Sequence, residues 1–343
     1  MRNINRKVFI IFVSVLFVSC VLVSCSTSKK HKVIKLAHSL DQSHSVHKAM
    51  VYMAEQLDKK SDGNLNIQIY PGGQLGSERE ALELLQIGSV GITKVSSAVM
   101  EGFVEDFKVL GLPYLFDSKE HMFSVLDGEI GQALLKTGEE VWLRGLCFYD
   151  AGSRSFYTKD KPINEPSDLN GLKIRVMKSI TAMEMVKALG GSPTPISWGE
   201  LYTALQSGVV DGAENNPPSF YLSHHYEVCK YYSIDEHTRV PDVLLISKTI
   251  WDKLSDQEKI WIQEAANESA VFQRKLWMKS EKVALEEVKK AGVEIVYPDK
   301  SKFVDMVAPL YDELIIDPKL KNLVTAIKES SPLKNVQNNE SKN

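Results

Sequence analysis

The spacing of apolar residues changes between two periods along the first part of the chain. Residues 33–37 form a short apolar run, and Val46, Met50 and Leu57 then recur at the spacing of one helix face. Between residues 64 and 70 apolar and polar positions alternate, which predicts a strand with one buried face. A strand, a helix and a second strand in so short a stretch indicate a βαβ unit and a parallel sheet.

The same order of elements repeats further along the chain. Residues 77–80, Ser-Glu-Arg-Glu, form a capping box that opens a helix ending at Gly88, before a predicted strand at residues 90–95. A second series follows from Cys147, with strands at residues 172–177 and 209–213, a helix at 181–189, and a helix that begins after Ser197 and runs through Leu205. The pattern therefore predicts an α/β fold.

A long helix is expected near the C-terminus. Residues 255–258, Ser-Asp-Gln-Glu, open a segment that reaches Ala291 without a glycine or proline. At 1.5 Å per residue this helix is roughly 50 Å long, which is more than one small lobe needs. We expect it to run along both lobes as a strut. The tail at residues 329–343 is rich in Ser, Asn and Lys and is predicted to be disordered.

The chain begins with an export signal. Arg2, Arg6 and Lys7 precede an apolar run at residues 8–23, the pattern of a secretion signal. Small residues before Cys25 resemble the bacterial lipobox, so residues 1–25 are expected to be a lipoprotein signal peptide with Cys25 lipidated and residues 26–32 as a tether. Cys20 is a second candidate for the lipidated residue.

The alternative for this segment is an uncleaved anchor, but the apolar run is short for a bilayer span. No other stretch of the sequence is apolar enough to cross a membrane. We therefore expect a protein that lies outside the cytoplasm and contacts the membrane only through its lipid.

Composition narrows the classes further. Outside the export segment only Cys147 and Cys229 remain, so a disulfide framework is not needed. The body that remains after the export segment, about 310 residues, is too long for one ordinary core, which suggests two lobes. Its net charge of -3 gives no electrostatic case for nucleic-acid binding.

Five ordered blocks of sequence carry a family resemblance. They resemble the solute-binding component of TRAP (tripartite ATP-independent periplasmic) transporters, the DctP-like family, over residues 33–325. The blocks are residues 70–80 (YPGGQLGSERE), 171–176 (GLKIRV), 191–195 (GSPTP), 199–206 (GELYTALQ) and 210–215 (VDGAEN).

The resemblance implies a two-lobed, periplasmic-binding-protein-like (type II) fold with crossing linker strands and one long helix. Lobe I would take residues 33–152 plus 241–280, and lobe II residues 153–240 plus 281–328, hinged near Gly152 and Pro241. The implied function is capture of an organic acid by lobe closure and its delivery to a membrane permease, with no cofactor.

Arg175 is the central candidate for ligand binding. In its strand Leu172, Ile174 and Val176 share one face, so Arg175 points to the other. The sequence alone favours a solvated surface arginine. The resemblance implies instead that the arginine of KIRV clamps the ligand carboxylate, to which a planar guanidinium gives two parallel hydrogen bonds.

Further lobe II residues gain a role from the same resemblance. It implies that Arg154 reinforces the grip, that the Asn215 amide bonds the carboxylate, and that Trp198 packs on the ligand, with Asn216 as a further polar contact. The alternatives are a loop salt bridge for Arg154, a cap before Pro217 for Asn215, and core packing for Trp198.

In lobe I the resemblance places variable ligand contacts at Glu78, Ser96, Asp242 and His38, each of which also suits a cap or surface group. Ser96 stands where sialic-acid binders of the family have an acidic residue, which weakens a sialic-acid assignment. Glu78 and Asp242 suit a polyhydroxy acid such as a hexuronate better than a C4-dicarboxylate, whose second charge they would repel.

The sequence gives little support to two other classes of function. An enzyme is not expected, because the sequence holds no Gly-x-Ser-x-Gly elbow, phosphate-cradling loop or His-Glu-x-x-His motif. The alternative function is a metal-binding surface lipoprotein that uses His38, His44 and His47, the last two one helical turn apart. No acidic or cysteine ligand accompanies them, so the metal signal is weak.

Overall fold

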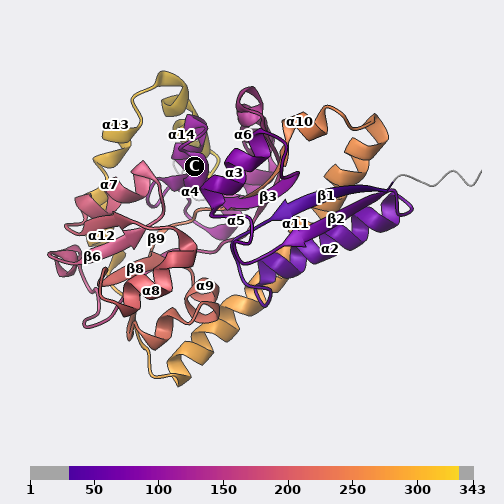
Figure 1. Ribbon diagram of the computed structural model, residues 1–343. Helices are drawn as coiled ribbons and strands as arrows, with labels where there is room; N and C mark the ends of the chain where they lie inside the picture. The colour runs from indigo at the N-terminus through magenta and orange to yellow at the C-terminus, as the bar shows by residue number, and fades with distance from the viewer. Residues whose placement is uncertain (1–30, 332–343) are drawn as a thin grey trace, which may run out of the picture. The chain divides into compact units, whose positions relative to one another are not determined.

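The computed structural model describes residues 31–331 and shows an α/β protein with two mixed sheets (Figure 1). Cys20, Cys25 and most of the predicted tail lie outside the described residues. The first sheet has the order β2 (Leu65–Tyr70), β1 (Lys32–Ala37), β3 (Ile92–Ser96), β10 (Asp242–Ser247) and β4 (Leu143–Tyr149). β1 and β3 are parallel, as the βαβ pattern predicts, and β10 runs antiparallel between β3 and β4.

The second sheet brings the candidate arginines onto nearby strands. Its order is β11 (Glu294–Val296), β9 (Tyr231–Thr238), β5 (Arg154–Thr158), β8 (Gly212–Asn215), β6 (Lys173–Val176) and β7 (Ser192–Pro195). β5, which carries Arg154, runs antiparallel to β8 and β9. β6, which carries Arg175, is parallel to β8, with Arg175 opposite Ala213.

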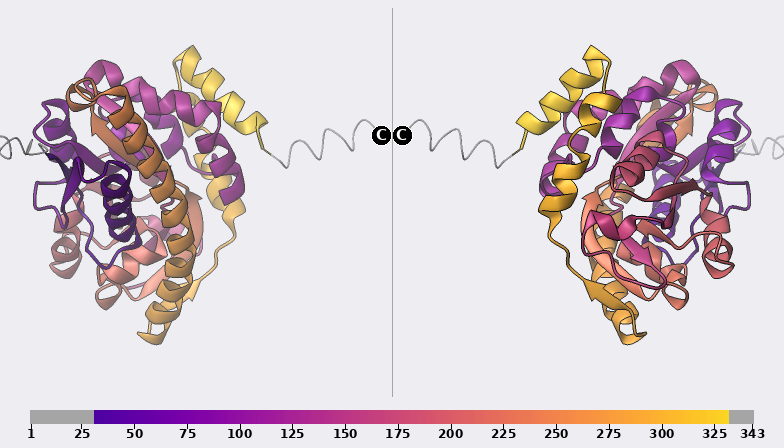
Figure 2. Two further views of the ribbon diagram at one scale, coloured as in Figure 1. Left: turned by 90° about the vertical axis from the view of Figure 1, so that its right-hand side faces the viewer. Right: turned by 90° about the vertical axis from the view of Figure 1, so that its left-hand side faces the viewer.

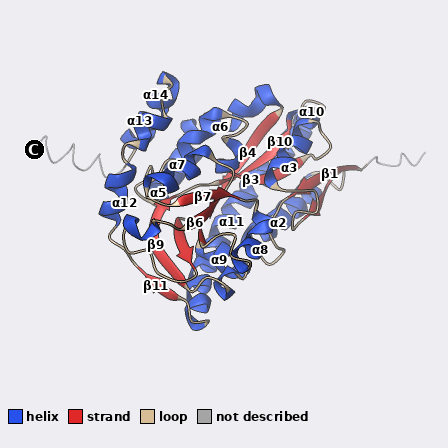
Figure 3. Cartoon of the chain, turned by 60° about the vertical axis from the view of Figure 1, so that its left-hand side comes forward, coloured by secondary structure: helices blue, strands red, loops and turns tan. Residues whose placement is uncertain are grey.

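Helices flank both sheets (Figure 3). Those near the first sheet are α2 (Ser45–Lys60), α3 (Glu78–Gln86), α4 (Ser97–Met100), η1 (Glu105–Gly111), α5 (Lys119–Asp127), α6 (Glu129–Thr137), η2 (Gly138–Val141) and α10 (Lys248–Trp251). The others are η3 (Pro166–Leu169), α7 (Ile180–Ala188), η4 (Trp198–Glu200), α8 (Leu201–Gln206), α9 (Pro217–Leu222), η5 (His225–Glu227), α12 (Lys300–Val307), α13 (Leu310–Leu314) and α14 (Pro318–Glu329).

One long helix, α11 (Asp256–Lys290), contacts elements of both lobes. It packs along α2 and β4 in lobe I and along α9 in lobe II, and it is the longest helix within residues 31–331 (Figure 2). Ser255 and Glu258 form the capping box at its start. The predicted strut helix and the two-lobed α/β fold are therefore confirmed.

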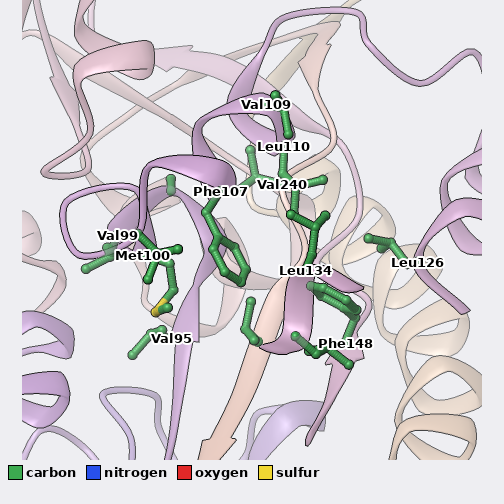
Figure 4. Close-up of a cluster of buried hydrophobic side chains, with 14 of the residues drawn as sticks. Val95, Val99, Met100, Phe107, Val109, Leu110, Leu126, Leu134, Phe148 and Val240 are labelled. Atoms are coloured by element: carbon green, nitrogen blue, oxygen red, sulfur yellow. The ribbon is translucent and has the colours of Figure 1, made fainter. Parts of the chain in front are cut away.

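The buried core is divided between the two sheets. One lobe I cluster gathers Phe107, Leu134 and Phe148 (Figure 4), and Leu320 and Ile327 of α14 join it from the end of the chain. Fully burying a side chain of this kind stabilises the fold by about 1.5–3 kcal/mol. The domain boundaries given above remain a prediction. They assign most of α14 to lobe II, although Leu320 and Ile327 of this helix pack in the lobe I cluster.

The strand predicted at residues 209–213 begins later, at Gly212. Gly208 has a positive φ of 75°, and the amide of Val209 donates to the carbonyl of Ala204. Residues 208–210 therefore belong to the turn that follows α8. The predicted strand begins too early because Val209 and Val210 are apolar, as strand residues often are. Across residues 31–331 the structure has no helix both long and apolar enough for a membrane span.

Candidate ligand-binding site

A cavity of about 640 Å³ is lined by residues of both lobes. Every predicted ligand residue except His38 lines it, which means Glu78, Ser96, Arg154, Arg175, Trp198, Asn215, Asn216 and Asp242. A volume of this size suits a small metabolite. The sheet topology thus brings together side chains that are far apart in the sequence.

Arg175 is a buried cation that lacks a counter-ion within residues 31–331. Its residue is 2% exposed, its Nε donates to the carbonyl of Ile196 at 2.8 Å, and no described Asp or Glu forms an ion pair with it. Its Nη1 has no hydrogen-bond partner among the described residues. Burial lowers the pKa of Arg175, but a guanidinium keeps its proton. A buried charge of this kind is costly unless an anion meets it.

Arg154, unlike Arg175, is paired with a carboxylate inside the protein. Its Nε donates to Glu214 Oε2 at 2.5 Å, and its Nη2 donates to Oε1 at 2.9 Å and to the Glu214 carbonyl at 2.8 Å. Its Nη1 donates to Asn215 Oδ1 at 2.8 Å. The charge of Arg154 is therefore balanced inside the protein, although Arg154 lines the cavity and holds the lining residue Asn215 by a hydrogen bond.

Behind Arg154 lies a buried network that the sequence analysis missed. His237 Nδ1 is 2.8 Å from Asp235 Oδ2, and its Nε2 is 3.4 Å from Glu214 Oε2. Burial alone would lower the pKa of His237, but Asp235 and Glu214 raise it to about 9. Burial opposes the ionisation of Glu214, yet Arg154 and His237 hold its pKa at about 2. The two cations and two carboxylates compensate each other.

Asn215 and Asn216 have separate roles. Asn215 Oδ1 accepts from Arg154, from the backbone amide of Asn216 and from Asn216 Nδ2, so the Asn215 amide nitrogen is the end of that side chain available to a ligand. Asn216 Oδ1 accepts from the amide of Ser219 at 2.8 Å and caps α9. The cap weighed for Asn215 is thus found one residue later.

The lobe I wall is built around a buried lysine. Lys94 Nζ is 3.0 Å from Glu78 Oε1 and 3.1 Å from Asp242 Oδ1, and all three residues line the cavity. Burial raises the pKa of Asp242 to about 6, against the opposing effect of Lys94. Ser96 donates its backbone amide to Glu78 Oε2 at 3.3 Å and caps α4 with its hydroxyl. When all are ionised, this group carries one net negative charge.

Trp198 lines the cavity and packs against the ring of His225, with centroids 5.1 Å apart. The Arg175 Cζ atom lies 5.8 Å from the centre of the indole. Trp198 therefore lies close to both Arg175 and the ring of His225. It lines the cavity and also packs against a hydrophobic core cluster of lobe II.

The predicted place of His38 in the site differs from what the structure shows. His38 Nδ1 accepts from the amide of Leu40, and its Nε2 lies 2.9 Å from His47 Nδ1. His38 is buried and is not one of the residues that line the cavity. His44, named only as a metal candidate, does line the cavity. Across residues 31–331, no group of three or more His, Cys, Asp or Glu side chains is placed to hold a metal ion.

The protein has two α/β lobes and a cavity to which one lobe contributes an uncompensated cation and the other lobe contributes polar groups. This arrangement is that of a solute-binding protein. The family model of bacterial extracellular solute-binding protein, family 7 (DctP) matches residues 36–317. The chain belongs to this family.

Relatives with known sequences and solved structures support the same family. A protein of Salmonella typhimurium called YiiZ, of uncharacterised function, is 40% identical over 86% of this chain and 90% of its own length. The C4-dicarboxylate-binding periplasmic protein DctP of Rhodobacter capsulatus is 30% identical over 82% of this chain and 86% of its own length.

Two crystal structures of TRAP periplasmic solute-binding proteins match closely in fold. One, from Xanthobacter autotrophicus with bound β-D-galacturonate, has a TM-score of 0.85 and 41% identity, covering 87% of this chain and 100% of that one. The other, from Anaerococcus prevotii with bound D-glucuronate, has a TM-score of 0.86 and 40% identity, covering 87% and 98%. The chain is thus a TRAP solute-binding protein, a class that binds small organic acids and works with membrane permease components.

Proposed function

We propose that this protein captures a hexuronate, with Arg175 and the Asn215 amide holding the carboxylate. The observation that carries the proposal is the buried, unpaired guanidinium of Arg175 in the cavity wall. A carboxylate placed there supplies the counter-ion and accepts two parallel hydrogen bonds. Arg154 supports the grip indirectly, because it fixes the orientation of the Asn215 amide.

The opposite wall favours hydroxyl groups over a second carboxylate. Glu78, Lys94 and Asp242 carry one net negative charge when ionised, and carboxylate oxygens accept hydrogen bonds from sugar hydroxyls. Two like charges about 5 Å apart repel by roughly 3 kcal/mol at an effective dielectric constant near 20. The two solved relatives described above carry a hexuronate, which supports the same choice over the C4-dicarboxylate of the Rhodobacter relative.

The capture mechanism that we propose is closure of two lobes, residues 33–152 plus 241–280 and residues 153–240 plus 281–328. The crossing between β4 and β5 contains Gly152 with φ of 61°, where a larger residue is strained and where a Cβ atom would lie 2.5 Å from Glu281 Oε1. Contacts of one ligand with both walls favour the closed form. The loaded protein then delivers the hexuronate to the membrane permease.

The proposal includes export and anchoring. The apolar run at residues 8–23 and the small residues before Cys25 support a cleaved signal and a lipid on Cys25, with Cys20 as the second candidate. Mass spectrometry of protein from a membrane fraction tests this. A diacylglyceryl adduct on an N-terminal Cys25, or on the second candidate Cys20, supports it, and an unmodified N-terminus overturns it.

Isothermal titration of the purified residues 31–343 tests the ligand. D-Glucuronate and D-galacturonate are expected to bind with micromolar or tighter affinity, and succinate, malate and sialic acid at least about tenfold more weakly. Submicromolar binding of succinate or malate without binding of either hexuronate would overturn the assignment.

A further inference from the structure

His44 carries a hydrogen-bond donor that no described residue uses. Its Nδ1 accepts from the backbone amide of Val46 at 3.2 Å and caps α2. Because a backbone N–H can only donate, Nδ1 holds a lone pair and the proton of the neutral ring lies on Nε2. Nε2 is buried and has no hydrogen-bond partner among residues 31–331.

The surroundings keep this ring neutral and fixed. His44 is 3% exposed, and burial, followed by the positive charge of Lys94, lowers its pKa to about 3. The ring packs against the indole of Trp277, with centroids 5.7 Å apart. The α2 cap and this packing hold the imidazole in place, so Nε2–H is an oriented, uncharged donor. Leaving a buried donor without an acceptor destabilises the ligand-free protein.

His44 lines the same cavity as Arg175 but comes from the other lobe. His44, Trp277 and Lys94 all line the cavity. When the carboxylate of a ligand lies on Arg175 in lobe II, the rest of the ligand faces lobe I. There Glu78 and Asp242 offer acceptors, and His44 offers the complementary neutral donor.

We propose that His44 is a specificity-determining residue that donates its Nε2–H to an uncharged oxygen, a hydroxyl or the ring oxygen, of the bound sugar acid. The inference rests on the hexuronate function proposed above and deepens it. It assigns His44 to recognition of the part of the ligand that a bare carboxylic acid lacks. The competing role for Nε2–H is a purely structural one over the indole of Trp277.

The variant His44→Asn separates the two roles of the ring. Asparagine is a strong N-cap, so its Oδ1 keeps the acceptor at the start of α2, while the donor that His44 holds at Nε2 is lost. His224→Asn is the matched control, because His224 is exposed, does not line the cavity and has a left-handed backbone that asparagine tolerates. Both variants are titrated with D-glucuronate and melted without ligand.

His44→Asn is expected to weaken D-glucuronate binding about tenfold, with the melting temperature of the ligand-free protein within about 2 °C of wild type. His224→Asn is expected to bind as the wild type does. In ¹⁵N-histidine spectra of the wild type, the His44 Nε2–H proton should shift downfield and exchange more slowly when glucuronate is added.

Two results overturn the inference, and they differ from each other. If the wild type binds glucuronate and His44→Asn binds it equally well, with an unshifted Nε2–H signal, the donor is structural and only the inference fails. If the wild type binds neither hexuronate, the proposed function fails and the inference fails with it.

Discussion

Arg154 grips Glu214 through two hydrogen bonds, from Nε at 2.5 Å and from Nη2 at 2.9 Å, in a fully buried ion pair. Arg175, two strands away in the same sheet, has no such partner within the described part of the chain. The two arginines therefore act differently. Arg154 balances charge inside lobe II, whereas the charge of Arg175 is uncompensated among the described residues, which supports its proposed role in binding a ligand carboxylate. Substitutions at the two positions should separate stability from binding.

Removing the Arg175 guanidinium should abolish tight binding without harming the fold. Arg175→Ala is expected to weaken hexuronate affinity by about two to four orders of magnitude, the cost of losing one partner of a buried charge pair. Arg175→Met, which removes a buried unpaired cation, should not lower the melting temperature of the free protein. Titration calorimetry and thermal melts check both. An Arg175→Ala variant with unchanged affinity would remove the clamp from the mechanism.

Glu214→Gln should destabilise the fold strongly. The substitution leaves Arg154 and His237 buried without their shared carboxylate, which costs roughly 3–5 kcal/mol of unfolding free energy. Glu264→Gln breaks only the surface pair with Lys60 and should change stability by less than about 1 kcal/mol. Urea unfolding of both variants measures the difference. Equal losses of unfolding free energy would show that the buried Glu214 network stabilises the fold no more than a surface ion pair does.

Stability should fall in alkaline solution because of His237. Its folded pKa of about 9 lies above the ordinary value of 6.5, so its contribution is fully present below pH 6.5 and is lost as the pH rises through 9. The unfolding free energy should drop by roughly 3 kcal/mol across this window. In His237→Gln the drop should be much smaller, and an equally steep profile in that variant would contradict the assignment.

Asp242 should make ligand discrimination depend on pH. Its pKa of about 6 means that it gains a proton as the pH falls from 7.5 to 5, which removes the net negative charge of the lobe I wall. The preference for D-glucuronate over the six-carbon diacid D-glucarate, whose carboxylates stay ionised over this range, should shrink about tenfold. In Asp242→Asn the preference should be low at both pH values. A constant preference in the wild type would refute this role.

How much the sequence predicts depends on how local each signal is. Arg175 is found because its block resembles a known family, since the alternation of its strand alone favours a solvated surface arginine. Lys94 is missed because every residue of β3 is buried. The strand therefore shows no alternation between buried and exposed positions that would single out Lys94. Glu214 and His237 are missed because they meet across β5, a contact that only the strand order of the second sheet creates.

The histidines illustrate the same limit. The spacing of His44 and His47 is a weak metal signal, yet the structure places the two rings in different surroundings, one lining the cavity and one paired with His38. Spacing along a helix places two side chains on one face, but it does not show what covers that face.

The proposed ligand capture depends on the buried, forked cation of Arg175, which we expect to bind an ionised carboxylate. Titration of the wild type with D-glucuronate and with D-glucuronamide, which keeps the hydroxyls and loses the charge, tests it most directly. The amide is expected to bind at least about 100-fold more weakly than the acid. Equal affinity for the two ligands would contradict it.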